Sequence, residues 1–263
     1  MKKSFKTFVC IIVVILLISF CDTISGQELQ GKVHYISKTN ITTNFGQRQL
    51  SKAQKARIKE RLNQSSTKNH ILTFNKSVSL FTEKENVSIQ QRNSRNGSGF
   101  KRFQNNQNLG TYYKDLANLK YVTQKNIYGK QFLIEDRLKE WNWQTTDEIK
   151  IIGKYTCFKA TIILPKENED TDTIITAWYT IEVPVSTGPE LFWGLPGLII
   201  ELHTPNIVYL CSKIELNKKD TITIKLPKKG KKVSQETYNK ILVKKIEEVK
   251  EQQKNRRSRS IKN

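Results

Sequence analysis

The chain has 263 residues, of which 37% are hydrophobic and 26% are charged, so it can build a hydrophobic core and is not an intrinsically disordered protein. Lys and Arg outnumber Asp and Glu by 45 to 24, which gives a formal net charge of +21 at pH 7. Such a charge favours an anionic partner, either nucleic acid or an anionic membrane surface. However, the sequence contains no zinc-finger, RNP-like or other nucleic-acid recognition motif.

Residues 1–26 have the three parts of a secretory signal peptide. Lys2, Lys3 and Lys6 make the start of the chain basic, and an apolar stretch runs from Val9 to Phe20. Ser25 and Gly26 are small residues at the expected cleavage point. The apolar stretch is shorter than the about 20 residues that a spanning helix needs, which disfavours a membrane anchor. We therefore expect cleavage after Gly26 and export to the periplasm, with or without association with the outer membrane. Export disfavours nucleic acid as the partner.

The first part of the mature chain predicts strands and one helix. The stretch KVHYIS (residues 32–37) is typical of a short strand, and residues 51–64 combine a possible N-cap, Ser51, with strong helix formers. Apolar and polar residues alternate over residues 70–83, which predicts two strands or one long bent strand. The polar residues 86–107 predict a mobile loop.

The following part of the chain reads as a succession of strands joined by turn residues. These strands are expected in the stretches TYYKDL, LKYVTQ, KQFLIEDRL, EWNWQTT, IKIIGKYTCFKATIILP, IITAWYTIEVPV, LIIELHT, VYLCSKIEL and TITIKLP. Because no helices are interleaved, the pattern predicts one mainly β domain over residues 27–227, built on a curved antiparallel sheet or an open barrel. The helix of residues 51–64 would lie at its periphery.

The C-terminal segment, residues 228–263, changes to a helical period. Tyr238, Leu242, Val243, Ile246 and Val249 fall roughly on one stripe, which predicts a basic amphipathic helix over residues 234–254. The last nine residues have almost no apolar content and predict a disordered tail. This basic segment is a candidate for docking to an anionic membrane surface, and the alternative is a solvated helix that only keeps the protein soluble.

No arrangement of residues in the sequence is typical of a catalytic or metal site. The histidines, His34, His70 and His203, lack metal-ligand spacing, and motifs for nucleotide binding, serine hydrolysis or thiol redox chemistry are absent. We therefore expect no cofactor and no metal. We expect Cys157 and Cys211 on neighbouring strands, where they can form a disulfide after export or remain two buried thiols. A thiol-dependent enzyme that uses Cys157 is the alternative to a non-enzymatic protein.

The stretch GPELFWGLPGLIIEL (residues 188–202) differs in composition from the rest of the chain. Gly188 and Pro189 predict a rigid turn, and Pro196 and Gly197 predict a type II turn in which Gly197 takes a positive φ. Leu195 and Leu198 are expected to pack inward. No side chain of residues 194–199 can transfer a proton or bind a metal, so the stretch has a structural role or lines a ligand site.

Tryptophans are the second kind of candidate. Trp141 and Trp143 would share one face if EWNWQTT is a strand, and Trp178 and Trp193 lie near or in the glycine- and proline-rich stretch. Each belongs either to the core or to an apolar groove at one end of a curved sheet. The residues proposed for ligand binding or for the turns are Trp178, Tyr179, Gly188, Pro189, Trp193, Gly194, Leu195, Pro196 and Gly197.

These segments resemble a known family. GLPGLI (residues 194–199), together with the order and spacing of YYKDL, FLIEDRLKEWNW, IIGKYTCFKATI and AWYTIEVPVSTGPELFW, is similar to the GLPGLI proteins, which are exported by Gram-negative bacteria. The resemblance covers roughly residues 31–227 and implies a cell-envelope location but no particular reaction. It also implies a partner such as a TonB-dependent outer-membrane receptor. We therefore expect an exported, non-enzymatic protein that binds an apolar ligand or an envelope partner.

Overall fold

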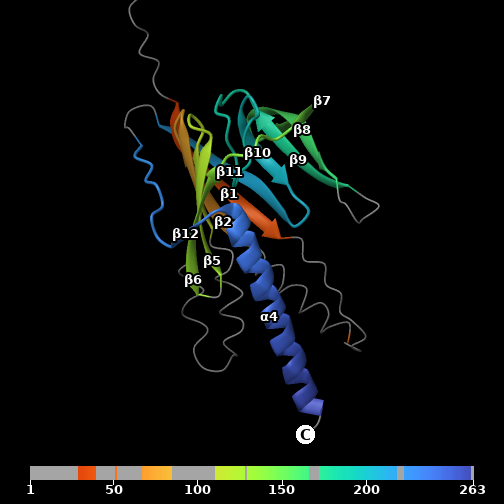
Figure 1. The fold of residues 1–263 in the computed structure, drawn as a ribbon. Coiled ribbons are helices and arrows are strands. Elements are labelled where there is room, and N and C mark those ends of the chain that lie inside the picture. The colour runs from red at the N-terminus through yellow and green to blue at the C-terminus, as the bar shows by residue number, and fades with distance from the viewer. Residues whose placement is uncertain are drawn as a thin grey trace, which may run out of the picture.

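The computed structural model describes residues 29–39, 51, 67–84, 110–127, 129–165, 172–217 and 222–261. Twelve strands form one sheet in the order β12-β6-β5-β4-β3-β2-β1-β11-β10-β9-β8-β7 (Figure 1). The elements are β1 (Gln30–Thr39), β2 (Thr67–Phe74), β3 (Val78–Glu83), β4 (Thr111–Asp115), β5 (Lys120–Ile127), β6 (Lys130–Arg137), β7 (Gln144–Ile152), β8 (Tyr155–Leu164), β9 (Thr173–Thr180), β10 (Leu198–His203), β11 (Ile207–Asn217), β12 (Lys231–Val233) and α4 (Gln235–Ile261). The expected mainly β fold with a C-terminal helix is confirmed.

Three expectations concern residues that the structure does not describe. The signal peptide of residues 1–26, the loop of residues 86–107, and all of the N-terminal helix after Ser51 lie outside the described residues. The predictions for these segments remain predictions.

Neighbouring strands pair antiparallel, with one exception. Lys231–Val233 runs parallel to Phe132–Ile134 of β6, so the alternation of strand direction stops at β12. The two ends of the order, β12 and β7, do not pair with each other, and the sheet is therefore open and not a closed barrel.

Alternation of side chains determines which face of the sheet is buried. In β1, Val33, Tyr35 and Ser37 are buried while Lys32 and Lys38 are exposed, as expected for a strand with one face against the core. Val33 lies opposite Leu72 of β2 in the strand register. We call the buried side the inner face.

The buried cluster is continuous across the sheet. Leu72 and Phe81, from β2 and β3, belong to the same buried cluster as Ala160 and Ala177, from β8 and β9. In the sheet order β1, β11 and β10 lie between these two pairs. Figure 1 shows that the sheet curves between its two ends.

One end of the sheet is the strand β7. Its pairing with β8 is interrupted by a register shift between Thr145 and Ile149, and the residues at the shift include Asp147 and Glu148. Figure 1 shows β7 at the rim of the sheet, with β8 on its inner side.

Three expected strands have different bounds in the structure. EWNW is irregular, because the strand starts only at Gln144, and residues 222–227 of TITIKLP form no strand; the short β12 follows them instead. The long run of residues 149–165 is divided into β7 and β8 at Gly153, which has a φ of 61°. Glycine takes this left-handed conformation without the steric cost that a side chain brings.

The helix α4 begins as the sequence predicts and continues further. The Ser234 hydroxyl accepts a hydrogen bond from the Thr237 amide at 3.2 Å, which is the expected N-cap. The ring of Tyr238 packs against Phe132 of β6. The helix does not stop at Lys254 but runs to Ile261, through residues expected to be disordered, because Arg and Lys are good helix formers and no Gly or Pro interrupts them.

Among the described residues, no helix is both long and apolar enough to cross a membrane.

The turn before β10 is built differently from the predicted type II turn. The glycine with a positive φ is Gly194, at 99°, and not Gly197. Gly197 is constrained by close packing instead, since a Cβ atom on it would lie 2.0 Å from the backbone oxygen of Thr180. Leu195 and Leu198 pack inward as predicted.

We expect Gly197→Ala to lower the free energy of unfolding by about 1 to 3 kcal/mol, the usual cost of forcing extra atoms into a packed site. The obstacle is backbone of β9, which cannot rotate away as a side chain can. Pro196→Ala is the matched control, because Pro196 is exposed and adjacent. Urea unfolding of both variants measures the difference, and equal stability of the two would contradict the close approach.

Candidate functional site

The two cysteines among the described residues, Cys157 and Cys211, are both free thiols in the structure. The expectation that they lie on neighbouring strands is wrong, because β9 and β10 separate Cys157 on β8 from Cys211 on β11. Cys157 is fully buried, and burial raises its pKa to about 11. A thiolate is the nucleophilic form of cysteine, so neither the burial nor the pKa suits a catalytic thiol.

Trp178 and Tyr179, the first of the proposed site residues, point to opposite faces of β9 because they are consecutive in a strand. Tyr179 is buried in the core, opposite Ile199 of β10. Trp178 is partly buried, and the Lys150 ammonium lies 4.2 Å from the centre of its ring while it pairs with Glu201 at 2.9 Å. These two aromatic side chains therefore do not form one groove.

The remaining candidates lie in residues 186–197, which we call the motif loop. The loop packs against the irregular EWNW segment, with the rings of Trp141 and Phe192 stacked at 4.9 Å. Three indole N–H groups donate to backbone oxygens across the contact: Trp141 to Leu191 at 3.2 Å, Trp143 to Trp193 at 2.8 Å, and Trp193 to Lys139 at 2.9 Å. These tryptophans hold the loop in place instead of lining a ligand site.

A buried lysine of the sheet holds the tip of the motif loop in position. The Lys114 ammonium, on the inner face of β4, donates to the backbone oxygens of Gly188 at 2.6 Å and of Phe192 at 3.0 Å. The side chain is completely buried, and burial lowers its pKa to about 7, although the Glu190 carboxylate acts in the opposite direction. Lys114 thus determines where the segment between its two acceptors lies.

The residue held at this tip is Glu190. Its φ of 48° is unusual for a residue with a side chain, and such strain is common at functional sites. Its carboxylate accepts a hydrogen bond from the Tyr209 hydroxyl at 2.5 Å and lies close to the Tyr112 hydroxyl. Burial, followed by the charge of Glu190, raises the pKa of both tyrosines, so both hydroxyls stay protonated donors.

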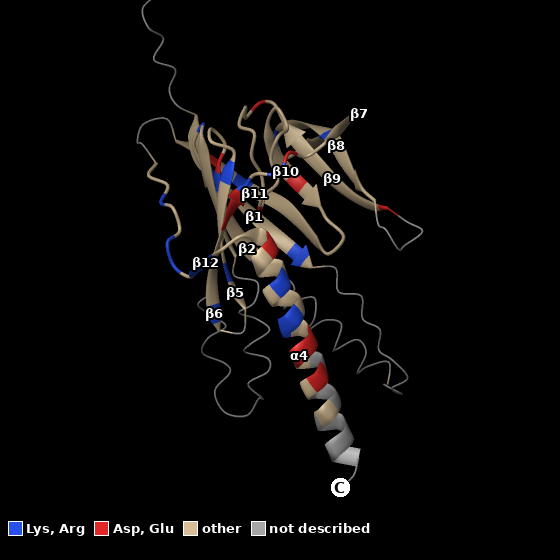
Figure 2. Ribbon diagram, viewed as in Figure 1, with Lys and Arg blue, Asp and Glu red and all other residues tan. Residues whose placement is uncertain are grey.

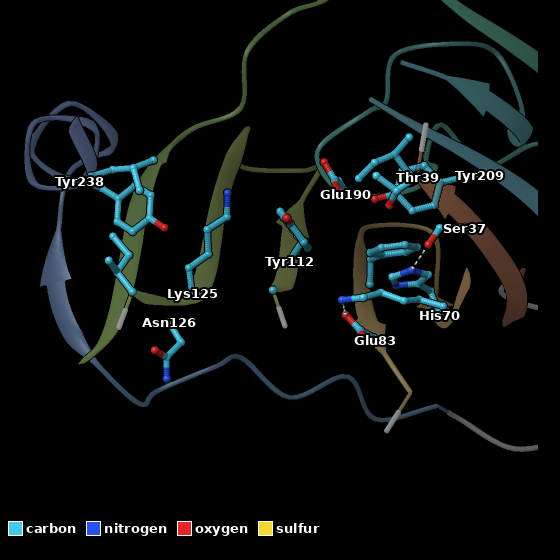
Figure 3. A pocket seen from close by; sticks show the side chains of 16 residues that line it. Ser37, Thr39, His70, Glu83, Tyr112, Lys125, Asn126, Glu190, Tyr209 and Tyr238 are labelled. Atoms are coloured by element: carbon cyan, nitrogen blue, oxygen red, sulfur yellow. Dashed lines mark hydrogen bonds and ion pairs between the residues drawn. The ribbon is translucent and has the colours of Figure 1, made fainter. Parts of the chain in front are cut away.

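Glu190 closes one side of a pocket of about 250 Å³ on the inner face (Figure 3). The strands β1 to β5 and β11 supply the floor, and α4 supplies a second wall. The lining residues are Ser37, Thr39, Lys68, His70, Phe81, Glu83, Gly110, Tyr112, Lys125, Asn126, Ile127, Glu190, Ile207, Tyr209, Tyr238 and Leu242. None of the nine residues proposed from the sequence lines it, but Glu190 lies between two of them, Pro189 and Trp193.

The walls of the pocket are partly polar, unlike the apolar groove expected from the sequence. Lys68 and Glu83 form an ion pair of 2.9 Å, and His70 shares a hydrogen bond of 2.9 Å with Ser37. The His70 ring stacks on Phe81 at 4.9 Å, and burial lowers its pKa to about 4. His70 is therefore a neutral hydrogen-bonding group at pH 7.

Register explains how six strands contribute to one site. Tyr35 of β1 pairs with His70, which pairs with Glu83, and Phe81 pairs with Tyr112 on the next strand. Paired residues share a face of the sheet, so these side chains point to the same side. The alternation over residues 70–83 predicts that one side of these strands is buried. It does not predict which other strands, β4, β5 and β11, complete the site.

Among the described residues, no group of three or more His, Cys, Asp or Glu side chains is arranged to hold a metal ion.

We expect the stability of the protein to rise from about pH 7 to pH 9 relative to that of Lys114→Met. The pKa of Lys114 is about 7 in the folded protein and 10.5 as the ordinary value, so in this window the unfolded chain binds a proton that the folded protein does not. Stability then rises with pH, by up to about 1.4 kcal/mol per pH unit.

Urea unfolding of both proteins at several pH values measures this difference. The raised pKa values of buried tyrosines and cysteines act in the opposite direction, but equally in the two proteins. Parallel pH profiles would mean that the pKa of Lys114 is not lowered on folding.

Comparison with known proteins finds one family and a few structures. Residues 165–201, which carry β9, the motif loop and most of β10, match a family described as "Protein of unknown function (Porph_ging)". The solved structure described as "Structure of PNGF-II in C2 space group" has a TM-score of 0.49 and 13% identity over 82% of this chain and 33% of that chain. "Structure of PNGF-II in P21 space group" has a TM-score of 0.47 and 14% identity over 81% and 32%.

The chain thus spans about a third of the length of these structures. No curated protein matches it. The family match falls on the segment that contains the GLPGLI residues and Glu190, and it assigns no activity to them.

Proposed function

We propose that this protein is an exported, non-enzymatic binding protein whose pocket takes a small polar ligand. The observation that carries the proposal is the placement of Glu190. Glu190 has a strained backbone conformation, its turn is held by Lys114, and its carboxylate lies beside Tyr112 and Tyr209. This carboxylate is at the edge of a pocket that also contains paired charges and aromatic rings. Binding sites for small molecules combine apolar and aromatic walls with a few placed polar groups in this way.

The size and lining of the pocket favour a small molecule over an acyl chain. A volume of about 250 Å³ is near the lower end for ligand sites, and Lys68, Glu83, Lys125 and Glu190 bring charges into it. An acyl chain would leave these groups buried without water, which is costly. Export, which this proposal includes, rests on residues 1–26 and on the resemblance to exported proteins.

We expect Thr39→Trp to abolish binding, because an indole at this position fills the pocket from the end of β1. Lys38→Trp is the matched control, since it adds the same ring to the exposed, opposite face of the same strand. Ligand-observed NMR with amino acids, dicarboxylates, sugars and sugar phosphates, each tested against the three proteins, measures binding.

At least one class should bind the unmodified protein and the Lys38→Trp variant but not the Thr39→Trp variant. Binding of no class, or equal binding to all three proteins, would remove the pocket from the function.

A second proposal concerns α4, which we propose docks to an anionic membrane surface. The helix stands away from the sheet beyond its first turns, and Val243 and Ile246 are exposed on it (Figure 1). Basic side chains lie along it and on the chain that leads to β12, although Glu residues are interspersed (Figure 2). Each Lys or Arg near an anionic leaflet contributes about 1 kcal/mol to binding.

We expect a chain that ends at Lys250 to bind anionic vesicles more weakly than the full chain, because residues 251–263 hold five Lys or Arg and one Glu. Cosedimentation with phosphatidylcholine vesicles, with and without phosphatidylglycerol, at low and high salt measures the effect. Binding should require phosphatidylglycerol and fade with salt. Equal, salt-independent binding of both chains would contradict docking by α4.

A further inference from the structure

The pocket contains two lysines, and only one of them has a carboxylate partner. Lys68 pairs with Glu83 at 2.9 Å. Lys125, from β5, forms no hydrogen bond or ion pair with any residue of the described part of the chain. The pocket therefore contains a cation whose donors none of the described residues uses.

Aromatic rings hold the Lys125 side chain in position. Its ammonium lies 5.4 Å from the ring centre of Tyr112 and 5.7 Å from that of Tyr238, on α4. Figure 3 shows the side chain extended between these two rings. Ring faces attract a cation but accept no strong hydrogen bond, so the three N–H groups stay available.

Glu190 does not serve as the missing partner. Its charge raises the pKa of Lys125, but burial is the larger effect and lowers that pKa below its ordinary value. The Glu190 carboxylate already accepts a hydrogen bond from Tyr209, and it makes no ion pair with Lys125. The partly buried ammonium thus loses part of its hydration, and no carboxylate of the described residues compensates for this loss.

We infer that the pocket binds its ligand through an anionic group, a carboxylate or a phosphate, seated against the Lys125 ammonium between Tyr112 and Tyr238. This inference rests on the proposed binding function and names the chemical class of the ligand. Both groups offer several acceptor oxygens to three N–H donors, and charge-assisted hydrogen bonds of this kind are about twice as strong as neutral ones. The remainder of the ligand would face the Glu190 and His70 side of the pocket.

The test uses pairs of probes that differ in charge. Succinate is compared with succinamide, and glucose 6-phosphate with glucose, while inorganic phosphate tests whether the anion alone suffices. Isothermal titration calorimetry is carried out on the unmodified protein, on Lys125→Met, on Lys125→Arg, on Lys120→Met and on Thr39→Trp. Lys120 is an exposed lysine on the same strand and provides the matched control.

The anionic member of at least one pair should bind about tenfold or more tightly than its neutral twin. Lys125→Met should abolish this preference, while Lys120→Met keeps it. The Lys125→Arg variant should also keep it, and this shows that charge, and not the shape of the side chain, is needed. The pair that shows the preference identifies the anion as carboxylate or phosphate.

Two results would overturn the inference in different ways. If neutral and anionic twins bind equally, with or without Lys125, but Thr39→Trp abolishes both, the ligand is neutral and only the present inference fails. If Thr39→Trp changes the binding of none of the probes that bind, the proposed binding function fails with it.

Discussion

The Lys114 ammonium is the interaction on which the rest of the site depends. It is buried, and it donates hydrogen bonds to the backbone oxygens of Gly188 and Phe192 in the motif loop instead of to a carboxylate. These two acceptors enclose the turn that carries Glu190. The curled sheet supplies the floor of the pocket, and hydrogen bonds from Lys114 and Tyr209, with a third between Ser79 and Thr187, hold the loop above it.

The chain uses lysine in two opposite ways within one face of the sheet. Lys114 is buried and donates to two backbone oxygens, while Lys125 is partly buried and donates to none of the described residues. Lys68 pairs with the Glu83 carboxylate, which is the ordinary kind of partner for a lysine. The high content of lysine gives no indication of these differences. Only the burial and the contacts of each side chain in the folded protein distinguish a solvated ammonium from a structural one or from a ligand-binding one.

The sequence predicted most of the strands, the N-cap Ser234 and the inward packing of Leu195 and Leu198, because these follow from alternation and local hydrogen bonding. It did not predict the pocket. Its floor comes from strands that meet only through long-range register, and Glu190 lacked any local sign of function. The glycines and prolines of the motif loop indicate backbone turns, so the sequence predicted a structural role for the loop. The structure shows that the loop also positions the Glu190 carboxylate.

An open sheet of twelve strands has a rim that could template the pairing of further chains. At β7 the ladder is interrupted between Thr145 and Ile149, and two acidic side chains occupy the interruption. A second chain that added itself here would meet an irregular backbone and would bury negative charges. The irregularity of this strand therefore disfavours the addition of a second chain at this rim.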